Sequence, residues 1–210
     1  PRGKVAVFSP HPDDEVIGPG GCVAIHRKRG EPVRALVVTD GRAGGTNTSR
    51  PAADYVATRR AECRAAAEVL GGVDLTFWDF PDSCEITEEA INEAAGRAAE
   101  WLRLDPPDVV YAPCPMDAHS DHAAVAEIAK RALKRTGYRG VVFGFEVWGT
   151  PAVDTVVDIG DVFETKIKAV PCFPSQLAEN PLDHFVAGLN AARALFLPKG
   201  GRYAEGFVTC

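Results

Sequence analysis

The sequence predicts an α/β domain built on a mostly parallel sheet. Short apolar runs rich in β-branched residues alternate with longer helical segments, which is the order typical of βαβ units. A length of 210 residues with 46% hydrophobic content suits one domain with a sizeable core. The composition does not break anywhere along the chain, so we expect residues 1–210 to form a single domain.

The first elements follow from apolar runs and glycine stops. Lys4–Phe8 ("KVAVF") is expected to be a buried strand, and Gly20–Arg29 a helix that ends at Gly30. Val33–Thr39 ("VRALVVT") is expected to be the second strand. The polar, Gly-rich segment Gly41–Asp54 is too long for a plain connection and suggests a binding loop.

Helix caps and stops place the elements that follow. The Ala-rich segment Ala57–Leu70 stops at two glycines, which predicts a helix. A short strand is expected at Leu75–Phe77, and then a helix at Glu88–Leu104 with Thr87 as its N-cap. The remaining expected elements are strand Val109–Ala112, helix Asp121–Lys134, strands Val141–Phe145 and Thr155–Asp158, and helices Val162–Ala169 and Leu182–Phe196.

The charge pattern favours a small-molecule ligand. The net charge of −6 comes from mixed signs without a block of like charges, so we expect no nucleic-acid partner. Apolar runs are shorter than the ~20 residues that cross a bilayer, so no stable membrane insertion is expected. The first residues, "PRGKVAV", lack a signal-peptide core, and a cytoplasmic location is therefore expected.

Six cysteines are scattered without a C-x-x-C pair, and we expect them to be reduced packing residues: Cys22, Cys63, Cys84, Cys114, Cys172 and Cys210. Cys114 lies near a histidine cluster, but it lacks a partner cysteine for a metal.

Two clusters of histidines and carboxylates each follow a predicted strand. "HPDDE" (residues 11–15) follows the first strand, and "MDAHSDH" (residues 116–122) follows "VVYA". Ligands of open parallel sheets bind beyond the carboxyl ends of the strands, so the two clusters are expected to meet at one site.

These residue types suit a catalytic metal. His11 and Asp14, three residues apart in a turn, together with His122, make a set that binds zinc and leaves positions open. Asp13 is the natural general base, because zinc lowers the pKa of bound water towards ~7. His119 is expected to stabilise an oxyanion or protonate a leaving amine, with Asp121 holding its other ring nitrogen.

Simpler interpretations remain open for each cluster. Asp13 or Asp14 could N-cap a helix, and "HSDH" could be a solvated helix start. Glu15 is expected to lie behind the metal ligands or to partner a helix start. His26 and His184 are expected to be surface or packing residues.

At these residues the sequence resembles the PIG-L/LmbE-like family of metal-dependent N-deacetylases. The family hallmarks are matched by "SPHPDDE" and by "HSDH", with Ser120 in place of a proline. Further similar stretches are "TDG", "TRRAECRAAAEVLG", "FPDS", "DIGDVFETKIKAV", "PSQL" and "GGRYAEGF". The resemblance implies a single Rossmann-like domain with a mostly parallel sheet flanked by helices. Zinc is the ion that it implies, with Fe²⁺ possible in the same site.

The resemblance implies the same ligands and catalytic residues as the reasoning above. It adds Arg59 as a substrate contact, for which a helix salt bridge with Glu62 is the alternative. It also adds Asp82 of "FPDS" as a residue that grips sugar hydroxyls. At Asp117 some relatives carry a tyrosine that binds the intermediate, so that contact is not expected here.

The reaction implied is removal of the N-acetyl group from an N-acetylglucosamine-containing conjugate, by attack of zinc-bound water with Asp13 as general base. Several stretches look most like the bacillithiol-type branch, which implies a glucosaminyl malate or a similar small conjugate. Some relatives form homo-oligomers. Two other functions stay open: a non-haem iron oxygenase, whose facial triad uses the same residue types but on a jelly roll, and a metal-stabilised sugar-binding module.

Overall fold

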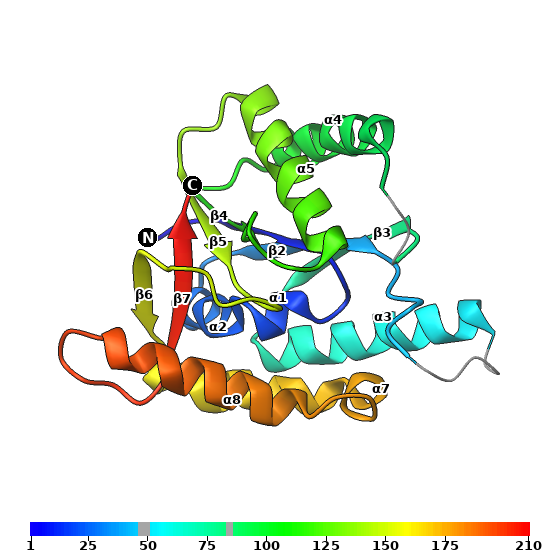
Figure 1. Cartoon of the computed structure of the whole chain (residues 1–210). Helices are drawn as coiled ribbons and strands as arrows, with labels where there is room; N and C mark the ends of the chain where they lie inside the picture. Colours follow the sequence, from blue (N-terminus) through cyan, green and yellow to red (C-terminus); the bar gives the residue numbers. More distant parts are fainter. Residues whose placement is uncertain (46–50, 83–85) are drawn as a thin grey trace.

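A seven-stranded sheet divides the helices into two layers in the computed structural model, which describes residues 1–45, 51–82 and 86–210 (Figure 1). The strands are β1 (Val5–Ser9), β2 (Val33–Thr39), β3 (Asp74–Phe80), β4 (Val109–Pro113), β5 (Val141–Phe145), β6 (Thr155–Asp158) and β7 (Ala204–Thr209). Their order in the sheet is β3-β2-β1-β4-β5-β7-β6. The first five strands pair in parallel, and β7 pairs antiparallel with β5 and β6. The predicted α/β class with a mostly parallel sheet is confirmed.

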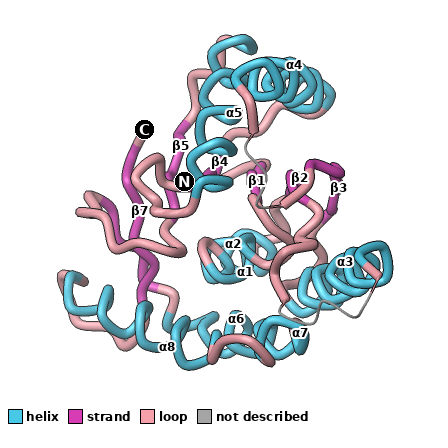
Figure 2. The backbone as a smooth tube through the Cα atoms, turned by 45° about the vertical axis from the view of Figure 1, so that its right-hand side comes forward, coloured by secondary structure: helices cyan, strands magenta, loops and turns pink. Residues whose placement is uncertain are grey.

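The helices lie on both faces of this sheet, as Figure 2 also shows. They are α1 (Asp14–Ile17), α2 (Gly20–Lys28), α3 (Ala52–Val69), α4 (Glu88–Leu104), α5 (Ser120–Thr136), α6 (Phe163–Ala169), α7 (Pro174–Leu177) and α8 (Leu182–Arg193). Short 3₁₀ turns occupy Gly160–Val162, Val170–Cys172 and Ala194–Phe196. Helices α4 and α5 pack together on one face, and α2, α3, α6 and α8 lie on the other (Figure 1).

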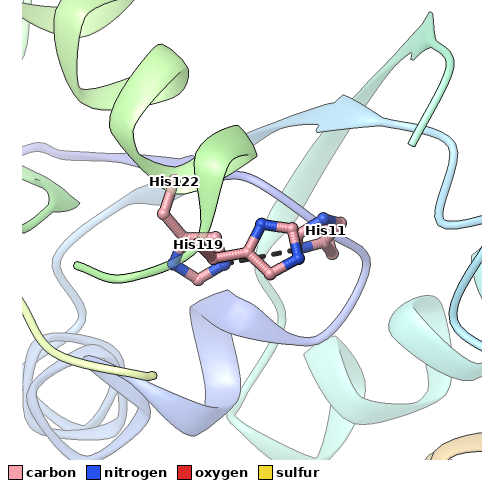
Figure 3. A group of neighbouring side chains, drawn as sticks. All are labelled: His11, His119 and His122. Atoms are coloured by element: carbon pink, nitrogen blue, oxygen red, sulfur yellow. Dashed lines mark hydrogen bonds between the residues drawn. The ribbon is translucent and has the colours of Figure 1, made fainter. Parts of the chain in front are cut away.

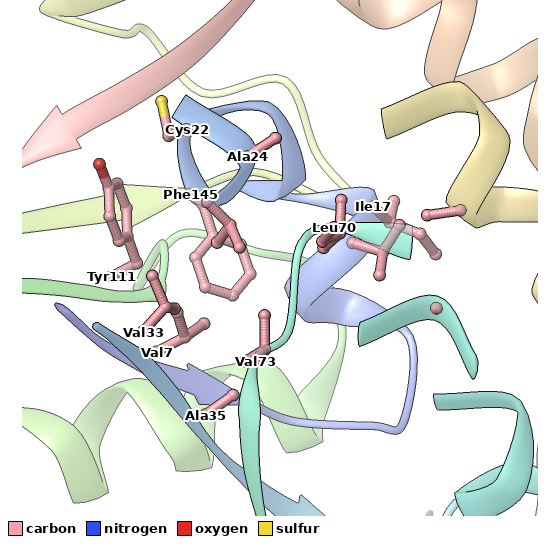
Figure 4. Close-up of a cluster of buried hydrophobic side chains, with 14 of the residues drawn as sticks. Val7, Ile17, Cys22, Ala24, Val33, Ala35, Leu70, Val73, Tyr111 and Phe145 are labelled. Carbon is pink, nitrogen blue, oxygen red and sulfur yellow. The ribbon is translucent and has the colours of Figure 1, made fainter. Parts of the chain in front are cut away.

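Alternation along the strands divides the core between the two faces. In β1, Val5 and Val7 join the cluster under α2 and α3, which Figure 4 shows in part. Ala6 and Phe8 join the cluster under α4 and α5. All four side chains are buried, because a parallel sheet with helices on both faces exposes neither face of its central strands.

The structure differs from the sequence prediction mainly in small elements. Strand β7 was not predicted, and it enters the sheet between β5 and β6 through long-range pairing that local pattern does not reveal. The four-residue helices α1 and α7 were also not predicted. Helix α3 begins at Ala52, within the segment predicted as a loop over 41–54. Strand β3 extends to Phe80 because Asp79 and Phe80 continue alongside β2.

The described cysteines, namely Cys22, Cys63, Cys114, Cys172 and Cys210, are free thiols. Cys84 and residues 46–50 of the predicted binding loop lie outside the described residues. In the part of the chain that the structure describes, no helix is both long and apolar enough to cross a bilayer. His26 is buried and packs beside Tyr111, whereas His184 is exposed, which agrees with the packing and surface roles expected of them.

Candidate active site

The two predicted clusters meet at the carboxyl ends of β1 and β4. These strands are adjacent and parallel, with Val7 paired to Tyr111, so the loops that follow them emerge side by side. His11 lies in the turn after β1, and Asp14 is the first residue of α1. His119 and His122 lie at the start of α5 and point towards His11 (Figure 3). The sheet therefore brings together residues that are 111 positions apart in the chain.

Three donor atoms form a tight triangle at this point. Asp14 Oδ2 lies 3.0 Å from His11 Nδ1 and 3.2 Å from His122 Nε2, and these two nitrogens are 3.3 Å apart. Tetrahedral ligands about 2.0–2.1 Å from a zinc ion stand about 3.3 Å from one another. The spacing of the three atoms therefore fits one face of a zinc coordination sphere.

The opposite ring nitrogens of both histidines face carboxylates. His11 Nε2 lies 3.2 Å from Asp121 Oδ2 and 3.3 Å from Asp82 Oδ1. His122 Nδ1 lies 3.3 Å from Asp117 Oδ2. Histidines that ligate metals usually have a carboxylate or carbonyl at the other nitrogen, which sets the tautomer and orients the ring. The carboxylates at the opposite ring nitrogens are therefore a second feature, independent of the donor-atom spacing, that is typical of a metal site.

The charges around the triangle also favour a cation. Burial alone would lower the pKa of His122, but Asp14 and Asp117 outweigh it and raise that pKa to about 9. Burial likewise opposes protonation of His11, yet Asp121, Asp14 and Asp82 raise its pKa well above the usual value. Protons on the two rings thus balance an excess of carboxylates. A divalent ion bound at the triangle would displace these protons and supply the balancing positive charge in their place.

Two wider groupings of possible ligands also include His11. One joins it with His119 and His122, and the other with Asp82 and Asp121; their donor atoms lie within 4.8 Å of one another. In the triangle of His11, Asp14 and His122, all three separations are 3.0–3.3 Å. Cys114, the other residue weighed as a ligand, does not belong to any group found among the described residues.

Asp13 is directed at an arginine and does not cap a helix. It stands at the N-cap position of α1, but its side chain makes no capping hydrogen bond. Instead, Asp13 Oδ2 accepts a hydrogen bond of 2.9 Å from Arg59 Nη2. Burial raises the pKa of Asp13 even though Arg59 works against this. A buried carboxylate with a raised pKa is a better proton acceptor than an exposed one.

Two side-chain contacts considered from the sequence, the alternative Arg59–Glu62 salt bridge and the expected contact of the Asp121 carboxylate with His119, are replaced by others. The carboxylate of Glu62 accepts hydrogen bonds from Ser175 at 2.9 Å and 2.6 Å, while Arg59 reaches across to Asp13. The Asp121 carboxylate lies against His11, and it is the Asp121 backbone N–H that donates to His119 Nδ1, at 3.2 Å. Because α5 begins at Ser120, its first turn directs the Asp121 side chain towards the loop after β1. His119 is thus the N-cap of α5, so the helix-start interpretation and the site interpretation both apply there.

Glu15 lies behind the ligands. It is buried, accepts hydrogen bonds from Ser9 Oγ at 2.7 Å and from Cys63 Sγ at 3.1 Å, and has a pKa raised to about 7 by burial. These contacts tie the turn after β1 to α3. Sequence reasoning did not single out Ser9 or Cys63, although Cys63 follows Arg59 at i+4 and so shares its helix face.

A cleft of about 310 Å³ opens over these residues. Five predicted site residues line it: His11, Asp13, Arg59, Asp82 and His119. The other described lining residues are Ala43, Gly44, Gly45, Trp148, Gln176, Glu179 and Asn180. Asp14, Asp121 and His122 are buried beneath it.

Two hydrogen bonds to the loop that contains Ala43 and Gly44 shape the wall of the cleft beside Arg59. Gln176 Nε2 donates to the Gly44 carbonyl at 2.9 Å, and Asp82 Oδ2 accepts from the Ala43 N–H at 3.0 Å. A Cβ atom at Gly44 would lie 2.5 Å from Arg59 Nη1, so a larger residue there would displace the Arg59 guanidinium. Asp82 therefore holds both this loop and His11, which sequence reasoning did not anticipate.

Comparison with known proteins identifies the family of this chain. The model of the PIG-L family, described as GlcNAc-PI de-N-acetylase, matches residues 6–133, which carry both clusters. The chain belongs to the PIG-L family. The predicted resemblance is thereby confirmed.

Three relatives of this PIG-L family protein cover 82–97% of its length. Diacetylchitobiose deacetylase of Thermococcus kodakarensis is 30% identical, covering 97% of this chain and 81% of its own. A probable N-acetyl-alpha-D-glucosaminyl L-malate deacetylase 2 of Bacillus cereus is 28% identical over 82% of this chain and 83% of its own. The 4-oxalmesaconate hydratase of Pseudomonas putida is 26% identical over 84% of this chain and 75% of its own.

A solved structure shares the fold. The N,N′-diacetylchitobiose deacetylase of Pyrococcus horikoshii, complexed with its inhibitor MPG, superposes with a TM-score of 0.82 at 25% identity. The match covers 99% of this chain and 83% of that one.

Proposed function

We propose that this PIG-L family protein is a metal-dependent deacetylase that hydrolyses the N-acetyl group of an N-acetylglucosamine-containing saccharide or conjugate. The products are acetate and a free amino sugar. The observation that carries the proposal is the 3.0–3.3 Å triangle of His11, Asp14 and His122 at the base of a cleft that Asp13 also lines. Family membership and the two deacetylase relatives support it.

The metal would be held by His11 Nδ1, Asp14 Oδ2 and His122 Nε2. A divalent ion, zinc or Fe²⁺, supplies Lewis acidity that polarises an amide carbonyl and makes water acidic near neutral pH.

Asp13 acts as the general base in this proposal. It takes the proton from the water that attacks the acetamide carbon, because it is buried and lines the cleft. Arg59 holds the carboxylate through one oxygen, Oδ2, which directs the group into the cleft. When the C–N bond breaks, the proton that was taken from the water is passed on to the departing amine, and the acyl group leaves as acetate.

His119 stabilises the oxyanion. Its Nδ1 accepts the Asp121 backbone N–H, so the proton of the neutral ring lies on Nε2, the nitrogen that remains to donate to substrate. Burial and the two neighbouring histidines lower the pKa of His119, which favours this neutral donor. Asp121 orients His11, and Arg59 and Asp82 line the cleft where a sugar would bind.

The test is acetate release from N-acetylglucosaminides by the metal-free, zinc-loaded and iron-loaded protein. Activity should require metal, and Asp13→Asn should lower kcat by about 10²–10⁴-fold. Asp161→Asn, which changes an exposed aspartate in the 3₁₀ turn before α6, is the matched control and should keep full activity. If Asp13→Asn turns over at the wild-type rate, the assignment of the base is wrong.

The rival functions give different readouts. An iron oxygenase would consume oxygen with iron and an oxo-acid, and its usual jelly roll differs from the sheet found here. A sugar-binding module would bind saccharides without releasing acetate. A hydratase like the Pseudomonas putida relative would hydrate 4-oxalmesaconate. We also propose, from the family resemblance, that the protein assembles as a homo-oligomer, which light scattering would show.

A further inference from the structure

Trp148 forms part of the wall of the cleft, and it has no role in the proposed hydrolysis. Trp148 follows β5, lines the cleft and is 42% exposed. Exposing an indole is unfavourable, because a large apolar surface stays in contact with water. An aromatic ring held open at the mouth of a binding cleft is therefore a candidate contact for a ligand.

Trp148 is held in place by a ring contact of its indole and by a hydrogen bond of its backbone. Its ring stacks on Phe185 of α8 with the centroids 5.9 Å apart and 20° between the planes. Its backbone N–H donates to Asp117 Oδ2 at 3.0 Å. That same oxygen lies 3.3 Å from His122 Nδ1, so one carboxylate links Trp148 to a candidate metal ligand. The position of the indole relative to the triangle is fixed by the fold.

The charge of the cleft decides what can lie on this ring. Its described lining includes three carboxylates: Asp13, Asp82 and Glu179. Arg59 is the one lysine or arginine among the described lining residues, and it is paired with Asp13. The indole presents the negative face of its ring, and these carboxylates line the same cleft, so a carboxylate laid on Trp148 would be repelled. A neutral group avoids this repulsion.

A sugar ring suits both the aromatic face and the charge. The C–H bonds on one face of a hexose carry partial positive charge, and they complement the negative face of an indole. The hydroxyl groups at its edge can hydrogen-bond to carboxylates and amides such as those of Glu179 and Gln176.

We propose that Trp148 is a stacking platform for a second, neutral sugar ring beside the N-acetylglucosaminyl unit. The inference rests on the proposed deacetylase function and specifies its substrate: a neutral N-acetylated saccharide of at least two rings. It differs from the glucosaminyl malate expected from the sequence.

The experiment compares three substrates of the metal-loaded protein: N,N′-diacetylchitobiose, N-acetyl-α-D-glucosaminyl L-malate and N-acetylglucosamine. The disaccharide should have the highest kcat/KM. Trp148→Ala should raise KM for the disaccharide about tenfold, equivalent to about 1.4 kcal/mol, and leave kcat nearly unchanged. Trp148→Phe should restore most of the loss, since it keeps an aromatic face. Phe196→Ala, which removes an exposed aromatic ring outside the cleft lining, is the matched control.

Two kinetic results would overturn the platform. One is a higher kcat/KM for the malate conjugate than for the disaccharide. The other is an equal effect of Trp148→Ala on the disaccharide and on N-acetylglucosamine, which would show a purely structural role for Trp148.

Calorimetric binding of N,N′-diacetylchitobiose separates this inference from the deacetylase function. Trp148-dependent binding without acetate release from any substrate would reject the deacetylase and support the platform. Acetate release with identical KM values in wild type and Trp148→Ala would support the deacetylase and reject the platform.

Discussion

Arg59 and Asp13 form a buried ion pair, 2.9 Å from Nη2 to Oδ2, that joins α3 to the turn after β1. The pair places a fixed positive charge beside the proposed general base. Without Arg59, Asp13 would be buried beside Asp14 with no cationic side chain bonded to it, and its position in the cleft would no longer be fixed.

Replacing Arg59 tests this pair. Arg59→Met should lower kcat/KM by about 10²-fold, because the base loses the group that orients it. Arg59→Lys should keep part of the activity. Arg60→Met is the matched control, since Arg60 is the adjacent residue of α3 and pairs with the exposed Asp79. Full activity in Arg59→Met would contradict a role in positioning Asp13.

Asp117 should support metal binding without being a ligand. It lies 3.3 Å from His122 Nδ1 and accepts the His119 N–H at 3.0 Å. Asp117→Asn should weaken zinc binding by about 10–100-fold in competition with a chelator, because the amide orients the ring less strongly. The exposed variant Asp161→Asn should bind zinc as the wild type does. An unchanged zinc affinity in Asp117→Asn would argue against this role.

A buried ion pair next to the link between α1 and α2 should matter for stability. Lys166 Nζ lies 2.6 Å from Glu205 Oε1 and donates to the Gly18 carbonyl at 2.8 Å. The Glu205 carboxylate also accepts from the N–H groups of Gly21 and Cys22 at the start of α2. Strand β7 is thereby attached to the segment that follows the metal-binding turn.

Breaking one half of this pair should be costly. Glu205→Gln should lower the free energy of unfolding by about 3–5 kcal/mol, because it leaves the Lys166 charge buried and unpaired. The double change Lys166→Met with Glu205→Gln should cost less than the sum of the single changes. Glu100→Gln, in the exposed Glu100–Arg103 pair, should cost about 1 kcal/mol or less. Denaturant unfolding measures all four variants, and additive single costs would refute the coupling.

His26 should make the fold sensitive to acid. Burial lowers the pKa of His26, although Glu31 acts in the opposite direction. In the unfolded chain the imidazole takes a proton below about pH 6.5, whereas the folded protein resists protonation until lower pH. The unfolded state therefore binds more protons, and stability is lost as the pH falls below about 6.5.

Unfolding at pH 7 and pH 5 measures this effect. The wild type should lose more stability over that interval than His26→Gln, which has no imidazole to titrate. His184→Gln, at an exposed histidine, should behave as the wild type does. Equal losses in the wild type and His26→Gln would show that His26 does not contribute.

The sequence was informative where a pattern is local. The apolar run "VAVF" and the glycine stop after Leu70 place β1 and the end of α3 to within a residue or two. Strand β7 escaped prediction because the residues of β5 and β6 that pair with it lie 46–66 positions earlier in the chain. Asp117 lay inside a quoted motif, yet its contact with His122 depends on how the loop after β4 folds.

By itself, the sequence determined that His11, Asp14 and His122 follow apolar strands of an α/β domain, because strand pattern and ligand type are both local properties. Only the tertiary structure decided which partner each charge has: Arg59 pairs with Asp13 and not Glu62, and the Asp121 carboxylate faces His11. Side-chain partners depend on distances of a few ångströms between elements far apart in the chain. Those distances are set by how helices pack on the sheet, and no local pattern encodes them.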